Sequence, residues 1–159
     1  MLKIKIISVG KIKEKSLKML IDEYVKRLGR YAKIETVELA DLPVPDNPSA
    51  GEILAVIEKE GAEIIKQISP RAMVVPMCIE GEKYTSEKFA RVIESAANTY
   101  PEIVFVIGSS HGLCDKVKKM GNIKMSMSDM TFPHNLAKLM LIEQIYRAFK
   151  INNNENYHK

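Results

Sequence analysis

The pattern of apolar and polar residues predicts strands and helices that alternate along the chain. Residues 2–9 (LKIKIISV) and 33–40 (KIETVELA) alternate with the period of two that half-buried strands show. Between them, residues 14–30 place apolar side chains at helical spacing, and Gly29 lies near the expected end of that helix. The N-terminal part therefore predicts a strand, a helix and a second strand.

The middle of the chain continues this alternation. Three prolines within residues 41–49 indicate a loop. Asn47 and Pro48 predict the cap and the first position of a helix that runs to about residue 68.

A buried strand is predicted next. Residues 72–79 (AMVVPMCI) are apolar on both faces, and we expect the strand to end at Gly81. Pro76 cannot donate a backbone hydrogen bond, so its presence indicates a sheet edge or a bulge. Thr85 then predicts the cap of a helix that reaches about residue 97.

The C-terminal third holds the most informative stretch. An apolar, β-branched run from residue 103 stops at Gly108, as a buried strand that ends in a tight turn does. A second strand-like run, residues 123–127, leads into a polar loop, and an amphipathic helix begins at Pro133. Two strand ends and a helix start are therefore expected to meet, and small ligands bind at such places in open α/β sheets. Residues 151–159 lack core periodicity and predict a flexible tail.

The alternation over all 159 residues predicts one α/β domain with a largely parallel sheet. No run of about 18 uncharged apolar residues exists, so no membrane span is expected. Cys78 and Cys114 are isolated and build neither a disulfide framework nor a zinc motif. We therefore expect a cytoplasmic protein.

Charge is distributed unevenly. Residues 1–33 contain ten Lys or Arg against three Asp or Glu, whereas residues 34–70 contain two against eight. A basic N-terminal segment fits a polyanion such as nucleic acid, and it fits the solvated face of a basic protein about as well. Charge alone leaves both interpretations open.

The last helix is apolar on more than one side. Five apolar residues together cover more of the helix than a single core face needs: Leu136, Leu139, Met140, Ile142 and Ile145. Such an excess predicts that the helix also packs against a second copy of the chain.

Motifs for several common activities are absent. There is no GxxxxGK[ST] and no GxGxxG, which disfavours a P-loop or a dinucleotide site. Residues 108–112 (GSSHG) match the GxSxG pattern of a hydrolase with Ser110 at its centre, for which His134 and Asp129 are the available partners. The three histidines lack metal-ligand spacing, so no metal site is expected.

Other polar residues allow two interpretations. His134, at a helix start, is either a packing residue or a functional one. Glu143 and Arg147 are four residues apart, which fits a simple helix salt bridge. Composition favours disorder for Tyr157 and His158, although their side chains suit base stacking and proton transfer.

Several blocks of the sequence resemble the RlmH family of ribosomal RNA methyltransferases: VFVIGSSHGL, SMSDMTFPH, LIEQIYRAFKI and the terminal YHK. Two N-terminal blocks, MLKIKIISVGKIKEK and DEYVKRLGRYAKIE, match the same family, so the resemblance spans the chain. It implies a SPOUT-type α/β fold, a parallel sheet flanked by helices with a C-terminal trefoil knot. It also implies a homodimer that uses S-adenosylmethionine, and no metal, to methylate N3 of a pseudouridine in 23S rRNA of the assembled 70S ribosome.

The resemblance also implies positions for the cofactor contacts. They fall on Met77, on Gly108 and on one loop that consists of Met127, Ser128, Asp129, Met130, Thr131 and Phe132. Ser109 stands where relatives commonly have a glycine. The residue types agree with this placement, because a glycine lets the backbone approach a ligand and strand-end amides and carbonyls can bind an adenine edge.

Methyl transfer to an imide nitrogen requires in-line positioning and the loss of the N3 proton, so a general base or a positive field is needed. The resemblance implies that Tyr157 and His158 act here, with His134 and Arg147 as further candidates. Two alternatives stay open: a non-catalytic ribosome- or RNA-binding module that retains the fold, and the Ser110 hydrolase.

Overall fold

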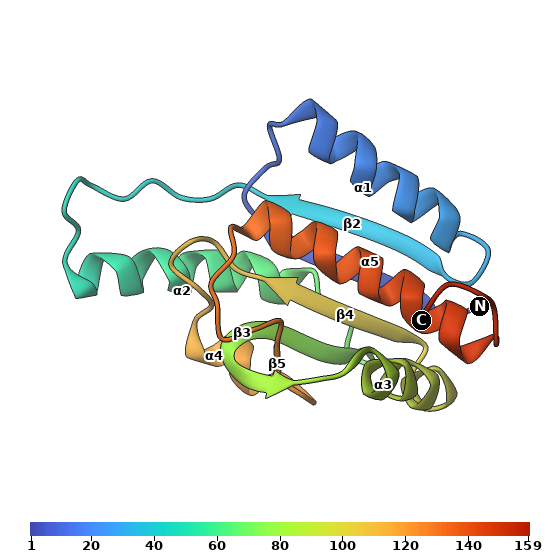
Figure 1. The fold of residues 1–159 in the computed structure, drawn as a ribbon. Helices are drawn as coiled ribbons and strands as arrows, with labels where there is room; N and C mark the ends of the chain where they lie inside the picture. The colour runs from blue at the N-terminus through green and yellow to red at the C-terminus, as the bar shows by residue number, and fades with distance from the viewer.

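The computed structural model describes all residues from 1 to 159. Strands and helices alternate in the order β1 (Lys3–Val9), α1 (Lys15–Leu28), β2 (Lys33–Leu39), α2 (Ala50–Lys66), β3 (Met73–Lys83), α3 (Ser86–Thr99), β4 (Glu102–Ile107), α4 (Asp115–Lys119), β5 (Met125–Ser126) and α5 (His134–Asn152). All strand pairs are parallel, in the sheet order β2-β1-β4-β3-β5 (Figure 1). The predicted α/β fold with a parallel sheet is confirmed.

β4 is the central strand, and all six of its residues are buried. Its continuous apolar run suits a parallel strand that is covered on both faces. Alternate residues of the neighbouring strand β1 divide between the faces, with Ile4 and Ile6 in one core and Ile7 and Val9 in the other. The larger core, of 21 buried residues, lies under α1, α3 and α5, and the smaller, of 9, lies under α2 and α4 (Figure 1).

β3 continues past Gly81 to Lys83, so the prediction that it ends at Gly81 is wrong. Met77 and Glu82 both pair with Met125, and the register shift between them marks an irregularity in β3. A Cβ on Gly81 would lie 2.7 Å from the carbonyl carbon of Met125. The glycine therefore permits close approach of β5 and does not terminate the strand.

Pro76 lies at a point where only β4 flanks β3 as a regular strand. Two residues earlier, Val74 donates its N–H to Asn122 Oδ1 (2.8 Å), on the side away from β4. Backbone N–H groups two residues apart in a strand point to the same side, so the N–H that Pro76 lacks would also have pointed away from β4. On that side β5 has not yet begun, and Gly121 packs against the proline ring. The local edge position that the sequence indicated is confirmed.

Helix caps follow side-chain chemistry. Ser49 caps α2 in a capping box with Glu52, so the prediction of Asn47 and Pro48 as cap and first position is wrong. Thr85 caps α3 as predicted, accepting a hydrogen bond from Lys88 N (3.1 Å).

The predicted flexible tail is folded instead. α5 extends to Asn152, and Glu155 accepts hydrogen bonds from the Tyr31 hydroxyl (2.7 Å) and from Lys150 Nζ (2.7 Å). Tyr157 packs edge-on against Tyr146, with ring centroids 5.1 Å apart. None of the helices combines the length and apolarity that a membrane crossing requires. The trefoil knot stays a prediction from the resemblance.

Candidate active site

Met77 joins the segments that the sequence analysis assigned to the cofactor. In the sheet register it stands opposite Ile107 of β4 on one side and Met125 of β5 on the other. Gly108 directly follows Ile107, and the loop of residues 127–132 directly follows β5. The register therefore brings the starts of both segments beside Met77.

Gly108 is held in a tight contact with the turn that follows it. A Cβ at this position would lie 2.7 Å from the carbonyl oxygen of Gly112. The turn is closed by Gly112, whose N–H donates to the carbonyl of Ser109 (2.9 Å). Any larger residue at position 108 must displace this turn.

The loop of residues 127–132 is organised by Ser128. Its carbonyl accepts a hydrogen bond from Ser126 Oγ (2.9 Å), and its own Oγ accepts one from Met130 N (3.1 Å). Asp129 forms an exposed ion pair with Lys83 (2.6 Å), which contributes little to stability. These hydrogen bonds define the shape of the first half of the loop.

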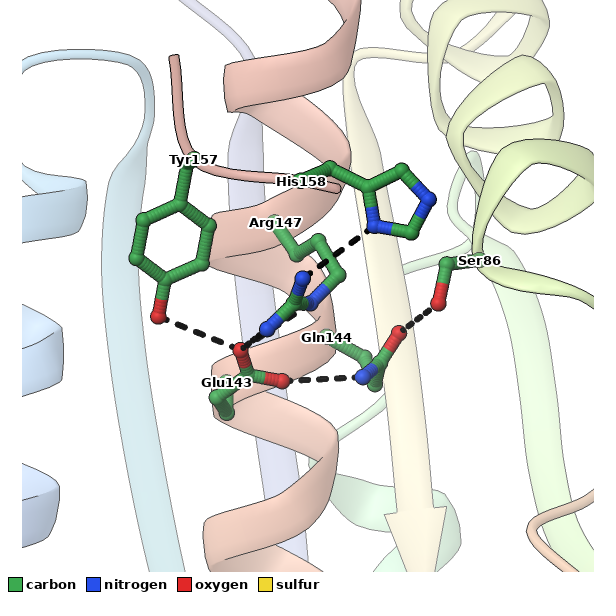
Figure 2. A network of polar contacts seen from close by, with 6 residues as sticks. All are labelled: Ser86, Glu143, Gln144, Arg147, Tyr157 and His158. Atoms are coloured by element: carbon green, nitrogen blue, oxygen red, sulfur yellow. Dashed lines mark hydrogen bonds and ion pairs between the residues drawn. The ribbon is translucent and has the colours of Figure 1, made fainter.

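Three of the four candidate catalytic residues belong to one network: Arg147 and Tyr157 contact Glu143, and His158 joins through Arg147 (Figure 2). Glu143 Oε1 accepts hydrogen bonds from Arg147 Nη2 (2.7 Å) and Nε (3.1 Å) and from the Tyr157 hydroxyl (3.2 Å). Arg147 Nη1 contacts His158 Nδ1 (3.1 Å), and its guanidinium lies 4.8 Å from the centroid of the Tyr157 ring. The tail and the second half of α5 thus form one polar network.

The neighbours of this network could not be predicted from the sequence. Gln144 Nε2 donates to Glu143 Oε2 (2.8 Å), and Ser86 Oγ donates to Gln144 Oε1 (2.8 Å; Figure 2). Glu87 Oε1 lies 2.6 Å from His158 Nε2. The only signal in the sequence was the Glu143–Arg147 spacing, because residues of α3 reach α5 only through the fold.

The hydrogen-bond partners fix the protonation of His158. Arg147 has only donors, so His158 Nδ1 must present its lone pair, and Nε2 then carries the proton and donates to Glu87. This hydrogen bond lowers the pKa of the Glu87 carboxyl. Both nitrogens of the docked imidazole are therefore occupied.

Tyr157 differs from His158 in what it can do chemically. Burial raises the pKa of the Tyr157 hydroxyl, and the nearby Tyr24 hydroxyl and Glu143 carboxylate raise it further. The hydroxyl therefore stays protonated near neutral pH. Tyr157 can donate a hydrogen bond there, and it cannot serve as a base.

His134 lies apart from the other three candidates. Its ring packs on Gly10 after β1, where a Cβ would lie 2.7 Å from Nε2, and this nitrogen is buried without a hydrogen-bond partner. His134 and Arg147 are thirteen residues apart on α5, about 20 Å along the helix axis. The structure thus supports a packing position for His134.

The residues named for a hydrolase do not form a triad. No hydrogen bond links Ser110 to His134 or to Asp129, and Asp129 is paired with Lys83. No group of three or more His, Cys, Asp or Glu side chains is arranged to hold a metal ion.

A cavity of about 460 Å³ lies between the loop of residues 127–132 and the polar network. Met127 lines one side of it, and Glu143 and Gln144 line another. Met77 and Gly108 do not reach it. The remaining lining residues come from α1, the connection between β3 and α3, α3, β5 and α5: Leu20, Tyr24, Tyr84, Thr85, Ser86, Phe89, Met125, Ser126, Leu139 and Met140.

Comparison with known proteins agrees with this arrangement. The family described as "Predicted SPOUT methyltransferase" matches residues 2–158. Ribosomal RNA large subunit methyltransferase H of Streptococcus thermophilus is 49% identical over 159 residues, which cover 99% of this chain and 100% of the relative. The proteins of the same name from an Exiguobacterium species and from Bacillus cytotoxicus are each 51% identical over 158 residues, covering 98% of this chain and 99% of the relative. The chain therefore belongs to the SPOUT methyltransferase family.

Proposed function

We propose that this enzyme transfers a methyl group from S-adenosylmethionine to N3 of a pseudouridine in 23S rRNA, on the assembled 70S ribosome in the cytoplasm and as a homodimer. The names of its full-length relatives support ribosomal RNA as the substrate. One structural observation carries the proposal. The cavity lies between the loop assigned to the methyl donor and the network that contains His158 and Arg147. Its size falls in the range of small-molecule sites, which leaves room for an extruded base.

The residues at the carboxyl edge of β3, β4 and β5 fit an adenosyl group. Met77 and Met127 are half-buried, apolar and unbranched at Cβ, so they can pack on adenine. Gly108 offers a backbone that a ligand can approach, and Ser128 shapes the loop that closes the site. These residues would hold S-adenosylmethionine, which supplies an electrophilic methyl group when bound.

The chain's own task is to handle the N3 proton of the target base. His158 is the titratable group suited to accept it, but both of its ring nitrogens are engaged in the docked tail. The tail must therefore leave Arg147 and Glu87 before His158 can act as a base. Arg147, once freed from His158, favours the imide anion by its positive charge.

An exposed apolar surface on α1 and α5 supports the homodimer. Met19 is 64% exposed, Leu20 45% and Leu136 42%. Ile142 and Ile145, also assigned to a partner surface in the sequence analysis, are fully buried in the chain's own core, so that part of the prediction is wrong. Leu20 belongs to this surface and also lines the cavity, together with Leu139 and Met140 of α5. A partner subunit bound there would therefore lie beside the cavity and close to the target nucleobase.

The basic N-terminal segment provides contacts for rRNA phosphates. Lys13, Lys15 and Lys26 are exposed and take part in no ion pair within the chain. Lysines of this kind bind phosphate in a salt-dependent and sequence-independent way. The loops and the tail would then carry the chemistry.

The proposal is tested by incubating the purified protein with labelled S-adenosylmethionine and 70S ribosomes from cells that lack it. We expect about one methyl group per ribosome, at N3 of one pseudouridine, and little transfer to protein-free 23S rRNA. Ribosome binding without methyl transfer, together with no measurable affinity for S-adenosylmethionine, would instead establish the non-catalytic module.

A further inference from the structure

We propose that Glu60 of α2 is a positioning residue for the loop after β4, and that it acts through the hydroxyl of Ser109. The inference rests on the proposed function, because it takes Gly108 to contact the methyl donor.

Glu60 is a buried carboxylate that takes part in no ion pair. Glu60 is only 4% exposed. Ser109 Oγ donates to Oε1 (2.9 Å), and the N–H of Leu42 donates to Oε2 (3.1 Å). A buried carboxylate without a cation is costly, so ordinary packing alone would favour an apolar residue. The carboxylate accepts both hydrogen bonds at once, one through each of its oxygens.

Close packing of α2 on the segment before α4 brings Glu60 to this place. Its neighbour Gly61 faces Cys114, and a Cβ on Gly61 would collide with the Cys114 sulfur. Glycine weakens a helix interior, so its presence here is explained by the close approach that it allows. Through these two hydrogen bonds, one carboxylate links α2 to the connection after β2 and to the loop after β4.

Ser109 transmits this attachment to Gly108. The carbonyl of Ser109 closes the turn by accepting from Gly112 N (2.9 Å), and Gly112 packs directly on Gly108. Holding the Ser109 side chain therefore holds the turn and with it the backbone of Gly108. In this chain the serine hydroxyl and Glu60 together set the loop geometry.

The test compares Ser109→Ala, Glu60→Leu, which removes both hydrogen bonds, and the double variant with the unaltered protein. Calorimetry gives the affinity for S-adenosylmethionine, steady-state kinetics on ribosomes give KM and kcat, and thermal unfolding monitors the fold. Each single variant should weaken binding about tenfold and raise KM more than it lowers kcat. The double variant should lose no more than the worse single variant, since the two residues act as one unit.

Two further variants separate positioning from a structural role. Ser109→Thr keeps the hydroxyl, so its affinity for S-adenosylmethionine should lie within about twofold of that of the unaltered protein. Glu63→Gln, one turn away on α2 in an exposed pair with Lys66, is the matched control and should bind as the unaltered protein does. Unchanged affinity in Ser109→Ala, or single losses that multiply in the double variant, would overturn the inference while leaving the proposed function intact. If the unaltered protein binds no S-adenosylmethionine, both proposals fail together.

Discussion

His158 and Tyr157 are neighbours in sequence with different chemical capacities. The imidazole is docked between a guanidinium that can only donate and a carboxylate that can only accept. The phenol is half-buried against Tyr146 and hydrogen-bonded to Glu143, and its raised pKa keeps it protonated. We therefore propose that His158 accepts the proton and that Tyr157 contributes packing and a hydrogen bond.

Substitutions in the tail should separate these two roles. His158→Ala should lower kcat for methyl transfer by about 10²- to 10⁴-fold, the usual contribution of a general base. Tyr157→Phe keeps the ring contacts and loses one hydrogen bond, so it should cost about tenfold or less. Single-turnover rates on ribosomes provide the comparison, with cofactor affinity as the control. A larger loss from Tyr157→Phe than from His158→Ala would reverse the assignment.

At Gly108 the expected effect is steric. Gly108→Val places a branched side chain where a Cβ already meets the Gly112 carbonyl at 2.7 Å. An overpacking cost of about 1–3 kcal/mol at the site corresponds to a loss of about 5- to 150-fold in affinity for S-adenosylmethionine. Calorimetry measures this loss, and thermal unfolding shows that the protein still folds. Gly51→Ala, where a Cβ meets its nearest neighbour at 3.9 Å, is the control and should bind normally. Equal affinity in Gly108→Val would remove this loop from the site.

Among the elements, those set by local pattern could be predicted from the sequence. The buried run of β4 and the Thr85 cap of α3 are properties of a few adjacent residues. Gly81 could not be read correctly, because its close neighbour is Met125, which β5 brings to it from 44 positions away. The tail was misjudged for the same reason. Its order depends on Tyr31 and Glu87, which lie far away in sequence.

The candidate site, like the fold, depends partly on local sequence patterns and partly on contacts between residues far apart in the sequence. Register explains why Met77, Gly108 and the start of the 127–132 loop lie together once strand order is known. Strand order itself is not encoded in a local pattern. The partners Ser86 and Gln144 were missed because neither belongs to a recognisable motif.

Helices α1 and α5 lie side by side (Figure 1). They expose apolar side chains that the proposed dimer would cover. Met19→Glu combined with Leu136→Glu should weaken dimerisation about a hundredfold or more, because two apolar contacts are lost and two carboxylates are buried. Neither residue lines the cavity. Leu54→Glu on α2, where the residue is 50% exposed, is the matched control and should leave the dimer unchanged. Sedimentation measures the association, and an unaltered protein that is monomeric at micromolar concentration would contradict the homodimer.

At the scale of the whole molecule, the central question is which subunit's tail serves which cavity. The tail is docked on its own subunit with both nitrogens of His158 engaged, and a partner on α1 and α5 would lie at the cavity. We therefore predict that each site is completed by the tail of the other subunit. Moving the tail would break its contacts with Arg147 and Glu87, a loss that new contacts at the partner's site must offset.

A mixture of two impaired subunits tests this arrangement, assayed at an S-adenosylmethionine concentration well below the weakened Kd of the Gly108→Val site. One subunit carries Gly108→Val, and the other lacks residues 157–159. Random exchange makes about half of the dimers mixed, each with one intact site of two, so the mixture should regain about a quarter of the normal rate. If it stays inactive while mass analysis shows mixed dimers, the tail acts on its own subunit or not at all.

The most direct test of the proposed function is the mass of 23S rRNA fragments from cells that lack this protein. The account predicts that one fragment, containing a pseudouridine, is lighter by a single methyl group. The unaltered protein should restore the mass, and the His158→Ala variant should not. Fragments of identical mass with and without the protein would contradict the account.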